Sequence, residues 1–354
     1  MEAGAAETYP DSVIDPSYVL RCLITLVEKE DKLRLVREGE VVQEEDETEE
    51  IELGCFLWDI ATSAEFVDFM LKHELLSILL RILANPTHSH RFREVIVGVL
   101  GNVGSVRSSA LNRQDLQAML VGMWVTNDDP PTLAELARCF TACVCTAEGQ
   151  QSWAPSLLDD DFIAKLAWIL RSSMSELLLQ RCAELLYALA YMGGQLATKL
   201  VWDHDMLGVL GAQLGQPEDR ITEKIAHLMW EVVELLLSRP GLAVHPENQP
   251  GQTSGVAEER VMRKMADAFV PVAVQWLRTE VDEDDVHKIC TLLLANTLAY
   301  LNEEQMAALI DARLVVSLVR LLSQSQDSGD EPIHLAVWVW AQQQLSLSGK
   351  RLRP

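Results

Sequence analysis

Residues 75–83 read LLSILLRIL, an apolar stretch with the spacing of a short buried helix. Residues 85–89, NPTHS, follow as a polar turn signal. Residues 93–102, REVIVGVLGN, then start a second helical pattern whose centre is made of small and apolar residues. An apolar helix, a polar turn and a longer helix therefore form one unit, and this unit decides the fold because it recurs.

The recurrence can be followed at one position, the middle of the last helix in each copy. Later copies pair residues 116–124 with 133–144, 162–170 with 177–190, 206–214 with 221–237, 269–277 with 286–300, and 314–322 with 333–345. The followed position falls at Asp59, Asn102, Ala142, Ala188, Glu231, Asn296 and Trp340. Successive positions differ by 43, 40, 46, 43, 65 and 44 residues, and the one large difference coincides with an insertion at residues 238–258. Paired helices with this period indicate an all-α, right-handed α-α superhelix of the armadillo/HEAT type, with six to seven repeats.

The same pattern predicts how the chain is divided. We expect a disordered N-terminus (1–16), repeats over 17–238 that include an acidic linker at 40–52, a flexible loop (239–257), two further repeats (258–347) and a basic tail (348–354). The acidic run over residues 44–52 is either a solvated linker or an arm that recruits a basic partner. Residues 129–132, DPPT, followed by Glu135, predict a helix start with Thr132 as the N-cap.

The charge of the chain limits the classes of partner. The formal net charge is −24, which opposes binding to nucleic acid or to an anionic membrane surface. A basic protein or peptide would be attracted electrostatically. The acidity could equally serve only to keep a large apolar stack soluble. No uncharged run is long enough to cross a bilayer, so we expect no membrane association and leave the oligomeric state open.

The cysteines and the first residues bear on the compartment. The chain has seven cysteines, an odd number, and most lie in apolar helical stretches. The first 16 residues have neither the basic nor the apolar segment of a signal peptide. We therefore expect free thiols and a reducing compartment, the nucleus and/or the cytoplasm.

Three motifs could carry chemistry, and each has a simpler explanation. His88 and His90 are expected to be surface histidines of a turn, because no cysteine or carboxylate pair stands nearby at metal-ligand spacing. Cys139, Cys143 and Cys145 stand among apolar residues, where free cysteine behaves as a small hydrophobic group. The glycines at 98, 101 and 104 share one helix side, where they would let a neighbouring element approach closely. We predict no catalytic residues, no metal and no cofactor.

The remaining candidate is the concave surface, where the last helix of each armadillo repeat binds extended peptides. The followed position places Asn102 and Asn296 there to hold a partner's backbone, and Asp59 and Glu231 to attract a basic one. Trp58 lies beside this position and is a further candidate contact, although tryptophans there, including Trp230 and Trp340, also suit the core. The position one turn earlier carries no tryptophan, so the Trp–Asn array of nuclear-import receptors is missing.

One stretch of the chain resembles a known family. Trp58-Asp59, the helix over residues 93–102 and the segment 129–135 (DPPTLAE) occur in this order and at similar spacing in the serum amyloid A-like proteins, whose animal members are also called synoviocyte proliferation-associated proteins. The resemblance covers roughly residues 45–150. It implies an armadillo-type fold, no known enzymatic activity, and an association with the nucleus and with cell proliferation.

Together these observations predict a non-catalytic scaffold that binds a protein partner, either basic or an extended peptide, along its concave face. Two alternatives stay open at this point. One is a chaperone-associated factor of the Hsp70 nucleotide-exchange type, and the other is a structural subunit of a larger complex. A third alternative, from a different functional class, is an enzyme that uses His88 and His90 or the cysteines at 139–145.

Overall fold

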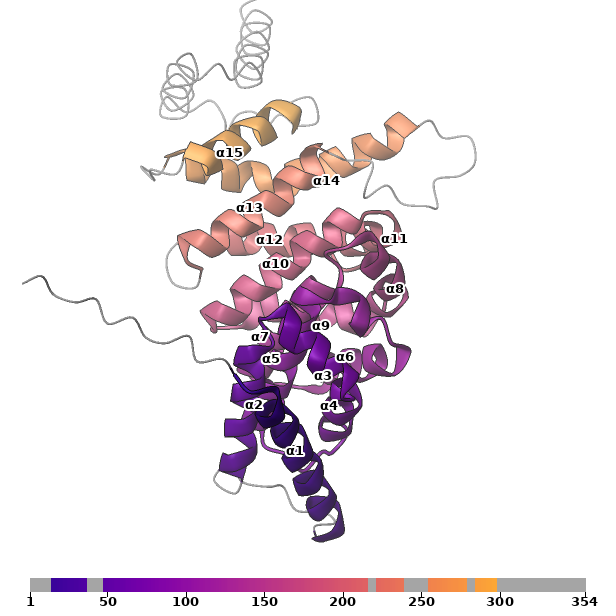
Figure 1. Cartoon of the computed structure of the whole chain (residues 1–354). Helices are drawn as coiled ribbons and strands as arrows, with labels where there is room; N and C mark the ends of the chain where they lie inside the picture. Colours follow the sequence, from indigo (N-terminus) through magenta and orange to yellow (C-terminus); the bar gives the residue numbers. More distant parts are fainter. Residues whose placement is uncertain (1–13, 37–46, 216–220, 239–253, 279–283, 298–354) are drawn as a thin grey trace, which may run out of the picture. The chain divides into compact units, whose positions relative to one another are not determined.

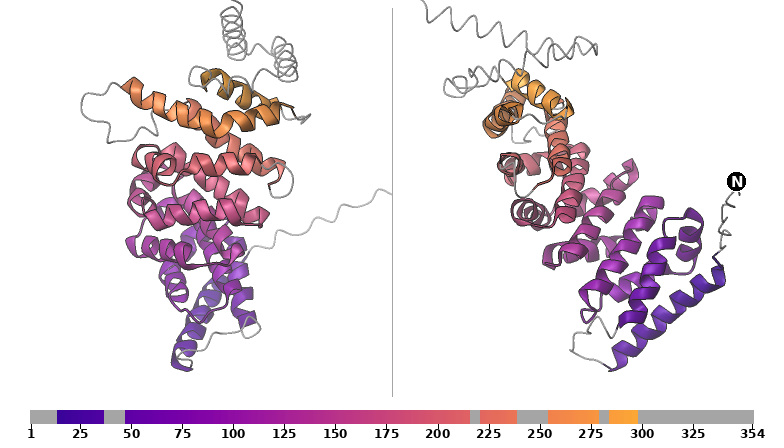
Figure 2. Two further views of the ribbon diagram at one scale, coloured as in Figure 1. Left: turned by 180° about the vertical axis from the view of Figure 1, so that it is seen from behind. Right: turned by 90° about the vertical axis from the view of Figure 1, so that its left-hand side faces the viewer.

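The computed structural model describes residues 14–36, 47–215, 221–238, 254–278 and 284–297. Throughout these ranges the regular structure is helical, with no β-strand. The chain divides into two compact units, unit 1 (residues 1–120) and unit 2 (residues 121–354). Each unit is a set of packed helices, shown from three sides in Figures 1 and 2.

The helices have the following bounds. Unit 1 contains α1 (Pro16–Val36), α2 (Thr48–Ile60), α3 (Ala64–Lys72), α4 (Leu75–Leu83), α5 (His90–Val106) and the 3-10 turn η2 (Ser108–Leu111), and α6 (Gln114–Thr126) spans the boundary. Unit 2 contains α7 (Pro130–Cys143), α8 (Ala147–Leu157), α9 (Asp160–Ser172), α10 (Glu176–Met192), α11 (Gly194–Thr198), the short π-helix η3 (Lys199–Asp203), α12 (Met206–Leu214), α13 (Glu223–Ser238), α14 (Ser254–Arg278) and α15 (Asp284–Thr297). Side-chain oxygens accept backbone hydrogen bonds at several helix starts, among them Asp15, Ser89, Asp129, Thr146, Asp159 and Ser175.

In unit 1, helix α5 packs along α2, and α1 packs against both α2 and α4. The short helix α4 buries one leucine- and isoleucine-rich face, as its apolar spacing predicts. Helix α5 is buried over most of its length, including its three glycines. The α2–α5 pair is therefore the centre of unit 1 (Figure 1).

In unit 2, the last helices of successive repeats form a row. Helix α10 packs between α7 and α13, and α15 packs on α13 and α14. Figure 2 shows these helices following one another from magenta to orange. We call α7, α10 and α13 the α7–α10–α13 row. Their solvent-facing sides are the surface that the sequence predicts for partner binding.

Aromatic side chains fill the core of unit 2. The ring of Phe140 lies 5.8 Å from Trp124, 5.9 Å from Trp153 and 5.1 Å from Phe162, measured between ring centroids. All four side chains are fully buried, and the indole Nε1 of Trp124 donates to the carbonyl oxygen of Phe162 at 3.0 Å. Helices α6, α7, α8 and α9 therefore meet at one aromatic cluster. A second cluster joins α13 to α14 and consists of Trp230, Phe269 and Trp276.

The predicted all-α superhelix is confirmed, and several helix bounds agree closely. Helices α4 and α12 have the predicted bounds of 75–83 and 206–214. The helix predicted at 269–277 is longer and starts at Ser254 as α14, so the last residues of the predicted loop 239–257 are helical. The predicted pair at 314–322 and 333–345, most of the loop, and the basic tail at 348–354 lie outside the described residues.

Two predictions about helix starts are corrected. The acidic linker predicted at 40–52 ends earlier, because α2 begins at Thr48 and buries Glu47 and Glu50 at its start. The N-cap of α7 is Asp129 and not Thr132. The Asp129 carboxylate accepts hydrogen bonds from the backbone N–H of Thr132 at 3.0 Å and from its hydroxyl at 2.6 Å. The boundary between the two units also falls inside the predicted block 17–238.

Candidate partner-binding surfaces

Three of the predicted residues lie where α2 and α5 meet. The half-buried ring of Trp58 lies on Gly98, where a Cβ would come within 2.4 Å of the indole Cε2. The side-chain amide of Asn102 donates to the carbonyl oxygen of Trp58 at 2.8 Å. Only a glycine at position 98 leaves room for the indole, so the predicted close approach is found there. Trp58 and Asn102 thus contribute to the packing contact between α2 and α5, which we call the α2–α5 joint.

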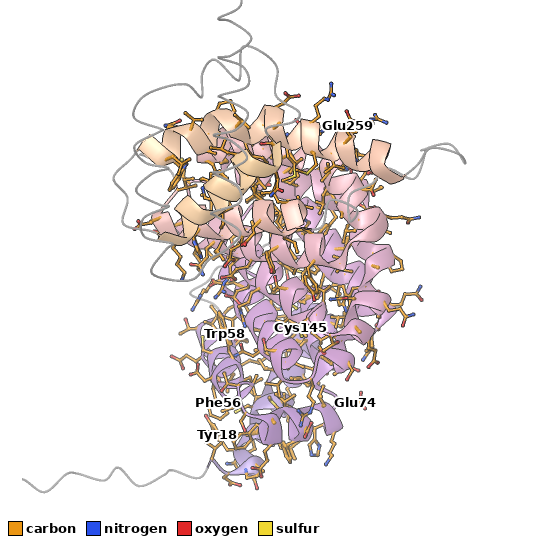
Figure 3. All side chains as sticks on the ribbon, turned by 90° about the horizontal axis from the view of Figure 1, so that it is seen from above. Tyr18, Phe56, Trp58, Glu74, Cys145 and Glu259 are labelled. Atoms are coloured by element: carbon orange, nitrogen blue, oxygen red, sulfur yellow. The ribbon has the colours of Figure 1, made fainter. Side chains whose placement is uncertain are left out.

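Asp59 and two aromatic rings lie near this joint. Asp59 is exposed at the end of α2, next to the joint. Tyr18 of α1 meets Phe56 of α2 edge to face, with 5.0 Å between ring centroids. Figure 3 shows these two labelled rings close to each other. The guanidinium of Arg21 lies 5.7 Å from the ring centroid of Tyr18, so this ring already has a cation from its own chain.

Glu47 belongs to a buried polar cluster that the sequence did not predict. His88, expected at the surface, is only 3% exposed, whereas His90 is exposed. Nε2 of His88 lies 2.7 Å from a carboxylate oxygen of Glu30, and Nδ1 contacts the carboxylate of Glu47. Glu47 also accepts from the backbone N–H of Ser89 at 3.0 Å. The cluster joins α1, the start of α2 and the turn before α5.

Its electrostatics favour a charged histidine. Burial disfavours the imidazolium, but hydrogen bonds to Glu30 and Glu47 outweigh this effect and raise the pKa of His88 from 6.5 to about 9. Burial also opposes ionisation of Glu47, whereas the hydrogen bonds from His88 and Ser89 lower the pKa of its carboxyl. With both ring nitrogens occupied and the ring buried, His88 stabilises unit 1 and has no access to a substrate.

The predicted carboxylate and amide of unit 2 lie on neighbouring helices. Glu231 on α13 is half-buried, and its carboxylate lies 3.5 Å from Nε2 of His227 one turn earlier, an ion pair only when His227 is protonated. Asn296 is exposed on α15, which packs on α13. Trp230, adjacent to Glu231, is fully buried, which confirms its assignment to the core.

The sequence did not predict the exposed apolar side chains on and near α10. Of the seven large apolar side chains exposed among the described residues, three lie on α10 and one lies just before its first residue. Their exposed fractions are 75% for Met174, 51% for Leu177, 37% for Tyr187 and 48% for Tyr191. The spacing of Tyr187 and Tyr191, one helical turn apart, was visible in the sequence. Whether the α10 face that carries these two rings is covered depends on how α7 and α13 pack against α10. No local sequence pattern reveals that packing.

The cysteine cluster has no special geometry. Cys139 and Cys143 are buried in α7, whereas Cys145 is exposed in the following turn. A hydrogen bond with Cys139, together with burial, raises the pKa of the Cys143 thiol. Within the part of the chain that the structure describes, no group of three or more histidine, cysteine or acidic side chains is arranged to hold a metal. Within the same ranges, no helix has the length and apolar character that a bilayer crossing needs.

Comparison with known proteins agrees with the predicted resemblance. No family model matches the chain. The chain is similar to proteins named SAAL1. It is 30% identical over 182 residues to Protein saal1 of Xenopus tropicalis and 28% identical over 170 residues to Protein SAAL1 of Homo sapiens. These matches cover 50% and 47% of this chain but only 39% and 35% of the relatives, so less than half of each relative's length is matched.

The solved structures that resemble this chain are armadillo repeat proteins. A computationally designed armadillo repeat protein for modular peptide recognition matches with a TM-score of 0.56 and 13% identity, over 78% of this chain and 99% of the designed one. Another, in complex with the peptide (KR)4, matches with a TM-score of 0.55 and 15% identity, over 79% of this chain and 99% of the other. At these identities the likeness establishes the armadillo-type fold alone.

Proposed function

We propose that this protein is a non-catalytic armadillo-type scaffold of the nucleus or cytoplasm that binds a basic segment of a protein partner. The contacts would be made on the outer faces of the last helices of the repeats. The candidate residues are Trp58, Asp59 and Asn102 in unit 1 and Glu231 and Asn296 in unit 2.

One observation supports this proposal most strongly. Helices α10 and α13 of the α7–α10–α13 row pack on each other, and they carry the exposed rings of Tyr187 and Tyr191 and the exposed carboxylate of Glu234. A net charge of −24 would attract a basic segment from a distance, mainly by raising the association rate. A structural relative was solved with the basic peptide (KR)4, which provides a defined probe.

The test is the binding of fluorescently labelled (KR)4 to the full chain, measured by anisotropy. We expect binding that weakens with added salt, and a further loss when Asp59→Lys and Glu231→Lys are combined. The matched control combines Glu65→Lys and Asp161→Lys, which change the charge equally at exposed positions of α3 and α9. Absence of binding to the wild-type chain would refute the proposal, and an equal loss in both variants would mean that net charge alone attracts the peptide.

A further inference from the structure

The two units differ in how many of their candidate binding residues are already bonded to other residues of the same unit. In unit 1, Asn102 donates to the backbone of Trp58, and the Trp58 ring covers Gly98. In the acidic run, Glu47 is bound by His88 and Glu50 lies 3.2 Å from the ammonium group of Lys29. The groups that the sequence offers for partner binding in unit 1 are therefore largely bonded within the unit.

In unit 2 the corresponding face is partly exposed, although Glu231 is half-buried and its carboxylate lies 3.5 Å from Nε2 of His227. Tyr187 and Tyr191 extend from the α10 face, and α13 carries Glu231 and the exposed Glu234 beside it. The repeat spacing puts Tyr191 and Glu234 at equivalent positions of adjacent helices, since Ala188 and Glu231 are equivalent.

Elsewhere in unit 2, the rings of Trp168 and Trp202 differ from that of Tyr187, because cations of the chain itself already lie over them. The exposed ring of Trp168 on α9 has the ammonium group of Lys165 4.8 Å from its centroid, and Trp202 has Arg260 and Lys264 at 5.3 and 5.1 Å. Among the described residues, no cation of the chain lies over the ring of Tyr187. This ring can therefore accept a cation from outside.

We infer that the partner-binding surface lies on α10 and α13 of unit 2, and that it binds a segment carrying lysine or arginine side chains. One cation would lie on the ring of Tyr187, and another would pair with the carboxylates of Glu231 and Glu234. Leu177 in the first turn of α10 and Met174 just before the helix add exposed apolar area for the aliphatic stems of such side chains. Charge complementarity favours this occupant over an acidic segment. The inference rests on the proposed function and assigns it to one of the two units.

The test compares single variants of the full chain for binding of labelled (KR)4. Glu234→Lys should weaken binding about tenfold and Tyr187→Ala about threefold, because exposed charge and cation–π contacts each contribute modestly. Tyr187→Phe keeps the ring and should bind like the wild type. Asp59→Lys, with the same charge change as Glu234→Lys but in unit 1, should change binding less than twofold.

The possible results separate the two proposals. If wild-type protein binds (KR)4 but Tyr187→Ala and Glu234→Lys bind equally well, the assignment to unit 2 is wrong while the proposed function stands. If Asp59→Lys has the larger effect, the surface lies in unit 1. If a (DE)4 peptide of the same length binds as tightly, the inferred cationic partner is wrong. If the wild-type chain binds no (KR)4, the proposed function itself fails.

Discussion

In unit 1, α5 joins α2 through glycine, an amide and a buried ion cluster, whereas in unit 2, α7 joins its neighbours through four aromatic rings. The joint of unit 1 depends on Gly98 leaving room for Trp58 and on His88 lying between two carboxylates. The joint of unit 2 depends on Phe140 in contact with Trp124, Trp153 and Phe162.

This difference shows that two parts of one repeat fold can be stabilised by different forces. The burial of apolar rings is driven by the hydrophobic effect and is nearly independent of pH, whereas a buried ion cluster requires complete hydrogen bonding and a defined protonation state. The difference also affects how many polar side chains are available to bind a partner. Where polar side chains hold helices together, as in unit 1, fewer of them are available to a partner.

The largest effect is expected in the aromatic core of unit 2. Phe140→Ala should lower the free energy of unfolding by about 3–5 kcal/mol, because it removes a buried ring and leaves a cavity between four helices. Urea titration followed by circular dichroism measures this loss. Tyr187→Ala on the exposed face of α10 is the control and should change stability by about 0.5 kcal/mol or less. A loss near zero for Phe140→Ala would show that the cluster does not stabilise unit 2.

The next effect distinguishes unit 1 by its dependence on pH. The folded pKa of His88 is raised to about 9 from 6.5, so its stabilisation is complete below pH 6.5 and is lost as the pH rises through 9. The shift corresponds to about 3 kcal/mol. The pKa of Glu47 is lowered from 4.5, so its contribution is complete above pH 4.5 and is lost as the pH falls through its folded value.

Urea titrations at a series of pH values measure this dependence. His88→Ala should lower stability at pH 6 and remove the decline between pH 6.5 and 9. The neighbouring His90→Ala is the comparison, since that side chain is exposed and its removal should change stability and the pH profile much less. A wild-type profile that is flat over this range would contradict a charged His88 in the cluster.

A smaller effect is expected at the glycine of the α2–α5 joint. Gly98→Ala should lower the free energy of unfolding by about 1–3 kcal/mol, because the new Cβ would overlap the ring of Trp58. Gly122→Ala in α6 is a matched control, since no other atom lies within 4 Å of the added carbon. That control should stabilise the helix by about 0.5–1 kcal/mol. If both substitutions stabilise the protein, the indole does not need the space at Gly98.

The smallest effect tests the start of α7. Asp129→Ala should lower stability by about 1 kcal/mol, because two hydrogen bonds to Thr132 are lost at the helix start. Asp128→Ala provides the comparison, since its exposed ion pair with Lys165 contributes little. Thermal unfolding of the two variants measures the difference. Equal melting temperatures for both would argue against Asp129 as the cap.

Local patterns predicted the helices well, since α4 and α12 have their predicted bounds. At the start of α7, Asp129 and Thr132 are both of residue types that cap helices, and the pattern predicts Thr132 where the structure has Asp129. The cluster of His88 with Glu30 and Glu47 was not predictable, because these residues are 58 and 41 positions apart and no local pattern relates them. The exposure of Tyr187 depended in the same way on α7 and α13.

The sequence by itself determined the repeat, the helical class and the acidic character of this protein, since these follow from periodicity and composition. Only the tertiary structure decided which polar groups are bonded internally and which face solvent. The physical reason is that burial depends on neighbours from distant parts of the chain. Glu47 is therefore bonded to His88 inside unit 1, whereas Glu234, a residue of the same type, is exposed on α13 in unit 2.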